Sequence, residues 1–99
     1  MNINPLTCVK CGLQLLSANQ ATKVAEVHPL KVSVAGEAIE YEEWWIVPAI
    51  PRFDNITVSR PDAEGYRYFS CADCEKVIVG FSAPANTERC FVACKLVNA

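Results

Sequence analysis

The sequence lacks a long apolar run, a leader-like start and a basic stripe, and each absence narrows the possible functions. No apolar run approaches the roughly 18 residues that a membrane-spanning helix needs, so we expect no membrane insertion. Residues 1–5 have neither the basic nor the apolar region of a secretory signal, which predicts a cytoplasmic protein. The nine Lys and Arg residues are scattered and the formal net charge is −2, so we expect no nucleic-acid partner.

Histidine is also scarce, and the chain is short. His28 is the only histidine, and it directly precedes Pro29, so we expect a structural role for it instead of a catalytic one. The 99 residues predict one domain, residues 1–99. A domain of this size buries about 60–65% of the surface of its unfolded chain, so its core alone gives marginal stability.

Cysteine, by contrast, is plentiful, with six residues in the chain. Four of them form two Cys-x-x-Cys pairs, Cys8-Val9-Lys10-Cys11 and Cys71-Ala72-Asp73-Cys74. Without a leader, these thiols favour a reducing compartment and a metal over disulfides. Four such thiolates make a closed tetrahedral set for Zn²⁺, which would join two distant parts of the chain. Two disulfides or one redox pair are the alternative interpretation.

Glycine supports the first of these turns. Gly12 directly follows Cys11 and can adopt a positive φ without steric cost, which allows backbone N–H groups to turn toward the sulfurs. The second turn continues with Glu75 instead of glycine.

Short alternating apolar segments predict seven or eight strands and no helix. Pro29 interrupts the segment 22–34 or places it at a sheet edge, and residues 38–43 are acidic and predict a solvated loop or edge. Residues 44–51 are apolar, but their two prolines exclude a central strand over the whole length. Further strands are expected over residues 13–16, 53–59, 66–69, 77–81 and 91–97. The pattern predicts a mainly β domain of several short, coiled antiparallel sheets, pinned at one end by zinc.

The C-terminal half then resembles a known family. It contains Trp45-Ile46-Val47, Phe53-Asp54-Asn55-Ile56, Cys71-Ala72-Asp73-Cys74-Glu75, Gly80-Phe81 and Phe91-Val92-Ala93. This series is similar to the signature of the Rab-interacting-factor family, the mammalian suppressors of a yeast Sec-four defect and their yeast relative. The match covers residues 45–99 together with the first Cys turn, residues 8–12.

The resemblance implies a fold, a metal and a partner. The fold is the β-tent, pinned by a zinc ion on Cys8, Cys11, Cys71 and Cys74. The partner is a Rab-type small GTPase of vesicle transport, bound in its nucleotide-free form, and the activity is slow guanine-nucleotide exchange or a chaperone function. Such a protein is a regulator and not an enzyme in the chemical sense, and we expect it to be a monomer.

Carried over position by position, the resemblance also implies where the partner binds. Asp73, inside the second Cys turn, corresponds to an acidic residue implicated in GTPase contact. The family's other contact segment is an acidic-Met-Phe triplet, which reads Ala49-Ile50-Pro51 here. This departure leaves a binder with weak or no exchange activity as an alternative. Trp44 and Trp45 must point to opposite faces of a strand. We expect Trp45 in the core and Trp44 half-buried or exposed as a partner contact.

Two other functions are compatible with the cysteine pattern. A methionine-R-sulfoxide reductase-like enzyme shares the β-tent and the zinc site, and its nucleophile would be Cys90. That chemistry needs an accessible thiol of low pKa and supporting histidines, and residues 76–81 contain none. The other function is a zinc-ribbon interaction module with a different partner. For Cys90 and Cys94 we otherwise expect buried, apolar roles on one face of a strand.

Overall fold

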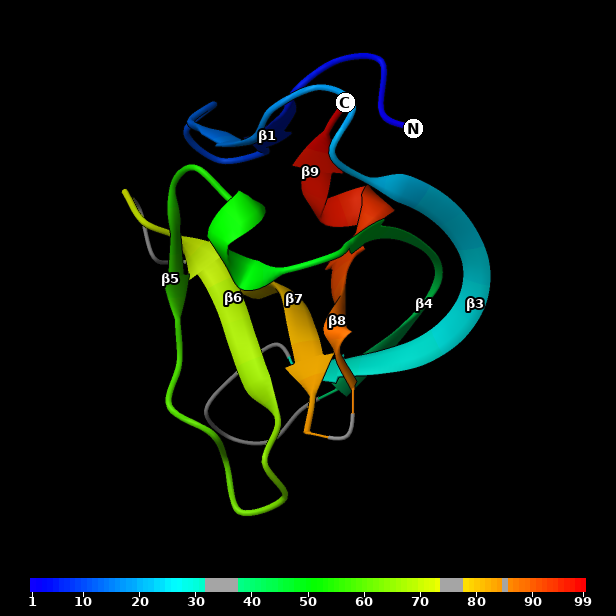
Figure 1. Cartoon of the computed structure of the whole chain (residues 1–99), viewed down its shortest axis with the longest axis vertical. Helices are drawn as coiled ribbons and strands as arrows, with labels where there is room; N and C mark the ends of the chain where they lie inside the picture. The colour runs from blue at the N-terminus through cyan, green and yellow to red at the C-terminus, as the bar shows by residue number, and fades with distance from the viewer. Residues whose placement is uncertain (32–37, 74–77, 85) are drawn as a thin grey trace.

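The computed structural model describes residues 1–31, 38–73, 78–84 and 86–99, which form two antiparallel sheets (Figure 1). The small sheet has the order β2–β1–β9, with β1 at Leu6–Cys8, β2 at Gln14–Leu16 and β9 at Val97–Asn98. The large sheet has the order β3–β4–β8–β7–β6–β5. Its strands are β3 (Thr22–Lys31), β4 (Ala38–Val47), β5 (Ile56–Val58), β6 (Arg67–Cys71), β7 (Ile78–Ala83) and β8 (Asn86–Ala93).

The helices among the described residues are two short 3₁₀ turns, η1 (Ile50–Arg52) and η2 (Cys94–Leu96). The mainly β prediction is therefore confirmed. None of the described helices has the length and apolar character that crossing a bilayer requires.

The two longest strands, β3 and β4, form a curved hairpin, and β3 is an edge of the large sheet (Figure 1). Pro29 lies opposite Glu40 in this hairpin, where an edge position tolerates its missing N–H. Strand β4 pairs with β8 only from Trp44 onward, so its acidic first half pairs with β3 alone. The expected solvated edge at residues 38–43 is confirmed. β4 then ends at Val47, before Pro48.

Two apolar clusters fill the interior on the two faces of the curved sheet. The first lies beneath the small sheet and includes Leu6, Leu15, Leu16, Val47, Phe69, Cys71, Val79, Cys90 and Val92. The second lies inside the curve of the β3–β4 hairpin and consists of Leu30, Trp44, Phe81, Phe91 and Ala93. Among the described residues, the buried cysteines of the predicted metal site, Cys8 and Cys71, belong to the first cluster.

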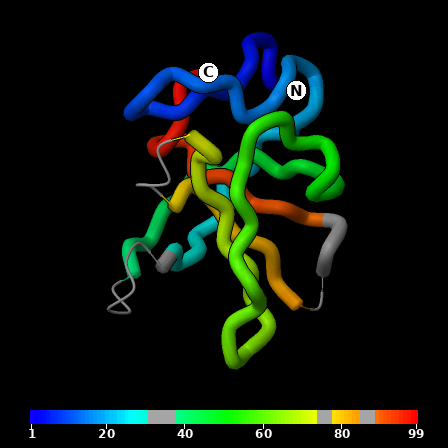
Figure 2. Tube along the Cα trace, turned by 90° about the vertical axis from the view of Figure 1, so that its left-hand side faces the viewer, coloured from blue at the N-terminus to red at the C-terminus, as the bar shows by residue number. Residues whose placement is uncertain are grey.

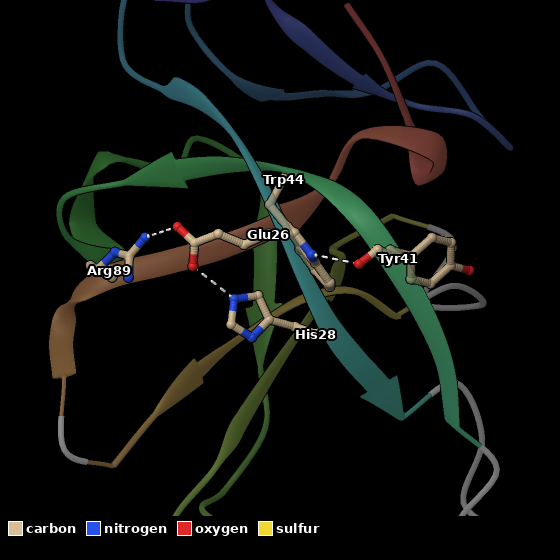
Figure 3. Close-up of polar contacts among 5 residues, drawn as sticks. All are labelled: Glu26, His28, Tyr41, Trp44 and Arg89. Carbon is tan, nitrogen blue, oxygen red and sulfur yellow. Dashed lines mark hydrogen bonds and ion pairs between the residues drawn. The ribbon is translucent and has the colours of Figure 1, made fainter.

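The expectation for Trp44 is wrong, and the expectation of a core position for Trp45 is met only in part, because Trp45 packs against the first apolar cluster. Trp44 is 0% exposed, whereas Trp45 is only partly buried. Trp44 lies between β3 and β8, and its ring is edge-on to Phe81 and Phe91 at centroid distances of 5.4 and 5.9 Å. Its indole N–H donates to the backbone oxygen of Tyr41 at 3.1 Å (Figure 3). Alternation places the two rings on opposite faces, but the curl of the hairpin encloses the face of Trp44, so Trp44 is not a surface contact.

Other departures concern where strands begin and end. No strand was expected before Cys8, but this stretch contains strand β1, and its Asn2 is only 1% exposed. The expected strand over residues 53–59 is shorter in the structure, where β5 covers only Ile56–Val58. The expected final strand over residues 91–97 is confirmed only at its ends, because β8 ends at Ala93, η2 covers Cys94–Leu96 and β9 begins at Val97. Cys94 therefore lies in η2, and Cys90 and Cys94 do not share a strand face.

Candidate metal centre and contact surface

The first Cys turn follows directly from strand β1. The N–H of Cys8 donates to the carbonyl of Leu13, and the N–H of Gly12 donates to the carbonyl of Cys8, both at 2.9 Å. Gly12 has a φ of +77°, as the sequence predicted. The N–H of Lys10 points at the sulfur of Cys8, at 3.4 Å. The turn thus closes on itself and directs a backbone donor at one sulfur.

The second Cys turn follows from strand β6, which carries Cys71 as its last residue. Cys71 pairs with Ile56 of β5, and the N–H of Ala72 donates to the carbonyl of Asn55 at 3.2 Å. Cys74, the fourth predicted ligand, lies outside the described residues, as does Glu75.

The structure brings three of the predicted ligands together. The sulfurs of Cys8, Cys11 and Cys71 all lie within 4.8 Å of one another, although Cys71 is far from the other two in sequence. Cys8 and Cys71 are buried, whereas Cys11 is exposed. The Cys11 and Cys71 sulfurs are 3.4 Å apart, much farther than the roughly 2.05 Å of a disulfide bond. Two thiolates on a tetrahedral zinc with bonds of about 2.3 Å lie roughly 3.8 Å apart, so the cluster has the dimensions of a metal site.

Asn55 connects the two Cys turns, a role that sequence reasoning missed. Its side-chain Nδ2 donates to the carbonyl of Gln14 at 2.7 Å, just after the first turn. Its own carbonyl accepts from Ala72 in the second turn. The Phe-acid-Asn-apolar motif was the available signal, since Asn55 is its third residue. Asp54 adds to the same connection, because its carboxylate accepts from Gln14 Nε2 at 2.9 Å and from Ser17 Oγ at 3.1 Å.

The predicted contact loop, Ala49-Ile50-Pro51, consists of the N-cap and the first two residues of η1, just before this motif. Pro51 is exposed, whereas Ala49 and Ile50 are half-buried, and Ile50 packs against the first apolar cluster. The N–H of Arg52 donates to the Ala49 carbonyl at 3.1 Å, which closes the loop. In Figure 1, η1 lies toward the same end of the molecule as the end of β6 that carries Cys71. The loop is therefore anchored, and it presents Pro51 at its surface.

Asp73, the other predicted contact residue, is exposed on the second Cys turn. It is one residue from Ala72, which bonds Asn55, and Asn55 follows η1 closely in the chain. The turn and the loop thus belong to the same end of the molecule, which also carries the small sheet (Figures 1 and 2).

The remaining two cysteines have environments that suit apolar roles. Cys90 is 0% exposed, and burial raises the pKa of its thiol to about 11. Burial also raises the pKa of the half-buried Cys94. A nucleophilic cysteine needs an accessible thiolate at neutral pH, and these surroundings favour the neutral thiol. The environment of Cys90 therefore opposes the reductase alternative.

Fold and site together define a class: a mainly β domain in which two distant Cys turns meet at a cluster able to hold a metal ion. Compared with known families, residues 1–99 match the family described as Mss4 protein. The chain belongs to this family. A curated relative from Schizosaccharomyces pombe, named guanine nucleotide exchange factor MSS4 homolog, is 36% identical over 52 residues. That match covers 52% of this chain and 52% of the relative, so the chain aligns with about half of the relative's length.

Proposed function

We propose that this protein binds a Rab-type small GTPase in its nucleotide-free state and acts as a weak guanine-nucleotide exchange factor or chaperone in vesicle transport. The observation that carries the proposal is the match of the whole chain to the Mss4 family, together with a relative named as an exchange factor. We place the protein in the cytoplasm, as a monomer, where such a GTPase is available to it.

Zinc is the metal that we propose for the sulfur cluster, with Cys8, Cys11, Cys71 and Cys74 as its ligands. A thiolate donor set suits Zn²⁺, and a site with four protein ligands has no position for a substrate. The metal would hold the two Cys turns together and so support the surface beside them. It takes no direct part in nucleotide release.

The proposed contact surface consists of Asp73 and the loop Ala49-Ile50-Pro51. An exchange factor works by binding the empty GTPase more tightly than the loaded one, because only differential affinity shifts the equilibrium. Asp73 offers a negative charge and Pro51 a stiff apolar contact, both exposed. Because the loop lacks the acidic and aromatic residues of the family triplet, we expect binding to persist with little acceleration of release.

Binding to a panel of nucleotide-stripped Rab proteins tests the proposal. Complexes are detected by gel filtration and calorimetry, and exchange is followed by release of a fluorescent guanine nucleotide. We expect a complex with at least one empty Rab, lost when GDP and Mg²⁺ are added. Asp73→Asn should weaken it about two- to fivefold, the range of one exposed charge pair. Glu42→Gln, a matched change at an exposed residue of β4, should leave it unchanged. No complex with any Rab would refute the proposal.

A further inference from the structure

A second feature of the surface lies at the opposite end of strand β6 from the Cys turns. A cleft of about 560 Å³ opens there, beside the turn that precedes β6, which Figures 1 and 2 show at the far end of the molecule from both termini. Its lining residues are His28, Pro29, Ala38, Asp62, Ala63, Glu64, Tyr66, Tyr68 and Phe81. None of them belongs to the metal centre or to the proposed GTPase contact.

Three aromatic rings, those of Tyr66, Tyr68 and Phe81, belong to the lining of this cleft, and packing holds them in place. Phe81 is only 6% exposed and stacks on Phe91 at a centroid distance of 4.9 Å. The ring of Tyr66 lies 6.1 Å from that of Phe81, and the imidazole of His28 lies 6.0 Å from it on another side. An aromatic ring attracts a cation to its face, and packing against Phe81 limits the rearrangement of Tyr66.

Two carboxylates complete the lining. Asp62 Oδ1 accepts from the N–H groups of Glu64 and Tyr66 at 2.9 Å, and its Oδ2 accepts from the Tyr68 hydroxyl at 3.2 Å. Burial raises the pKa of Asp62, but these hydrogen bonds outweigh it and hold the pKa below its ordinary value of 3.8. Glu64 is exposed in the same turn.

Within the part of the chain that the structure describes, no lysine or arginine lies among the lining residues. The nearby Arg89 is paired with Glu26 at 2.6 Å, and the same carboxylate also bonds His28 Nε2 at 3.0 Å (Figure 3). The Arg89 guanidinium lies over Phe91, 5.0 Å from its ring centroid. Near this cleft, the guanidinium of Arg89 thus contacts both a carboxylate, that of Glu26, and an aromatic ring, that of Phe91. The described lining of the cleft offers the carboxylates and the aromatic face, without a lysine or arginine.

We propose that this cleft binds an arginine side chain of a protein partner, with the guanidinium between Tyr66 and the carboxylates of Asp62 and Glu64. A planar guanidinium can stack on an aromatic ring and bond a carboxylate in the same position, which an ammonium cannot do as well. The apolar stem of arginine matches the walls formed by Pro29, Ala38 and Ala63. This site is separate from the GTPase contact, and its test does not depend on GTPase binding.

Titration of the isotope-labelled protein with N-acetyl-arginine amide, followed by NMR amide shifts, tests the proposal. We expect saturable shifts at residues 62–68 and 81, and none from the neutral isostere N-acetyl-citrulline amide. The lysine analogue should bind more weakly. Equal binding of citrulline and arginine would overturn the proposal. Binding of free guanidinium ion as tight as that of N-acetyl-arginine amide would also overturn the proposal, because the site would then bind small cations and not an arginine side chain.

Two variants separate the contributions of charge and ring. Glu64→Gln and Tyr66→Leu should each weaken arginine binding about two- to fivefold, which is the range for an exposed ion pair or cation–π contact. Asp62 is left unchanged because it organises the turn. Glu42→Gln, an exposed carboxylate outside the cleft, is the matched control and should bind as the parent does. Unchanged affinity in both Glu64→Gln and Tyr66→Leu would refute the assignment.

Discussion

At the scale of single residues, two asparagines connect segments that no strand pairing joins. Asn55 links the two Cys turns, and Asn2 holds the start of the chain to the segment before β3. The Asn2 side chain donates to the carbonyls of Asn4 and Ser17 and accepts from the N–H groups of Gln20 and Ala21. Each bond satisfies a backbone group that would otherwise lose water without compensation.

We therefore expect Asn2→Ala to lower the free energy of unfolding by about 2–4 kcal/mol, because several part-buried backbone groups lose their partner at once. Urea unfolding followed by tryptophan fluorescence measures the change. Asn4→Ala, at an exposed position, is the control and should stay within roughly 0.5 kcal/mol of the parent. A loss for Asn2→Ala as small as that of the control would show that these bonds add nothing to stability.

At the scale of elements, the close pairing of β7 and β8 explains two of the family motifs. Gly80 lies opposite Val92 and Phe81 opposite Phe91, so the Gly-Phe pair and the Phe-Val-Ala segment are neighbours in the sheet. A Cβ added at Gly80 would lie 1.9 Å from the backbone oxygen of Phe91. Glycine is required there by close approach of the two backbones and not by its φ angle.

Gly80→Ala should accordingly force β7 and β8 apart and lower the free energy of unfolding by more than about 2 kcal/mol. Thermal unfolding followed by circular dichroism measures it. Ala25→Val adds bulk at an exposed position of β3 and should change stability by less than about 0.5 kcal/mol. If Gly80→Ala changed the stability as little as Ala25→Val does, the result would contradict the close approach of β7 and β8.

A second prediction at this scale concerns the ion pairs of β3. The hydrogen bond from His28, followed by that from Arg89, holds the pKa of Glu26 below its ordinary value of 4.5. A lowered carboxyl pKa stabilises the fold above the unfolded-state pKa, and this contribution is lost as the pH falls through the folded-state value. Unfolding free energy should therefore decline as the pH falls below 4.5.

Urea titrations at a series of pH values measure this decline, and Glu26→Gln should flatten it because the amide does not titrate. Glu42→Gln should retain the slope of the parent. If the unfolding free energy of Glu26→Gln declined with falling pH as steeply as that of the parent, the His28–Glu26–Arg89 contacts would not form in solution.

At the scale of the whole molecule, the proposed metal would join the small sheet to the large one. Cys8 ends β1 of the small sheet, and Cys71 ends β6 of the large sheet. A domain of this size has a small core, so a metal that holds distant segments together contributes directly to folding.

We expect one zinc per chain by elemental analysis, and a loss of more than about 10 °C in Tm on metal removal by a strong chelator. Cys11→Ser should lose the metal and reproduce the low Tm. Cys94→Ser, at a half-buried cysteine outside the cluster, should keep one zinc per chain. Metal-free protein with the Tm of the parent would rule out a structural role for zinc.

Sequence patterns predicted the fold class and the meeting of the Cys turns, but not the burial of each residue. The Cys-x-x-Cys spacing and Gly12 are local signals, and the structure confirms the turn at Gly12. The burial of Trp44 was misjudged and that of Asn2 was not predicted, because both depend on residues distant in sequence, Phe91 for Trp44 and Ala21 for Asn2. The cleft also depends on distant residues, since His28 and Tyr66 come from different parts of the chain.

By itself the sequence determined the β class, the ends set by prolines and three cysteines of a candidate metal site, because spacing and backbone restrictions act locally. The tertiary structure alone decided which tryptophan is buried, how Asn55 joins the Cys turns and where carboxylates and aromatic rings meet in a cleft. These features arise from the curl of the sheet and the approach of distant strands, and a linear pattern carries no measure of either.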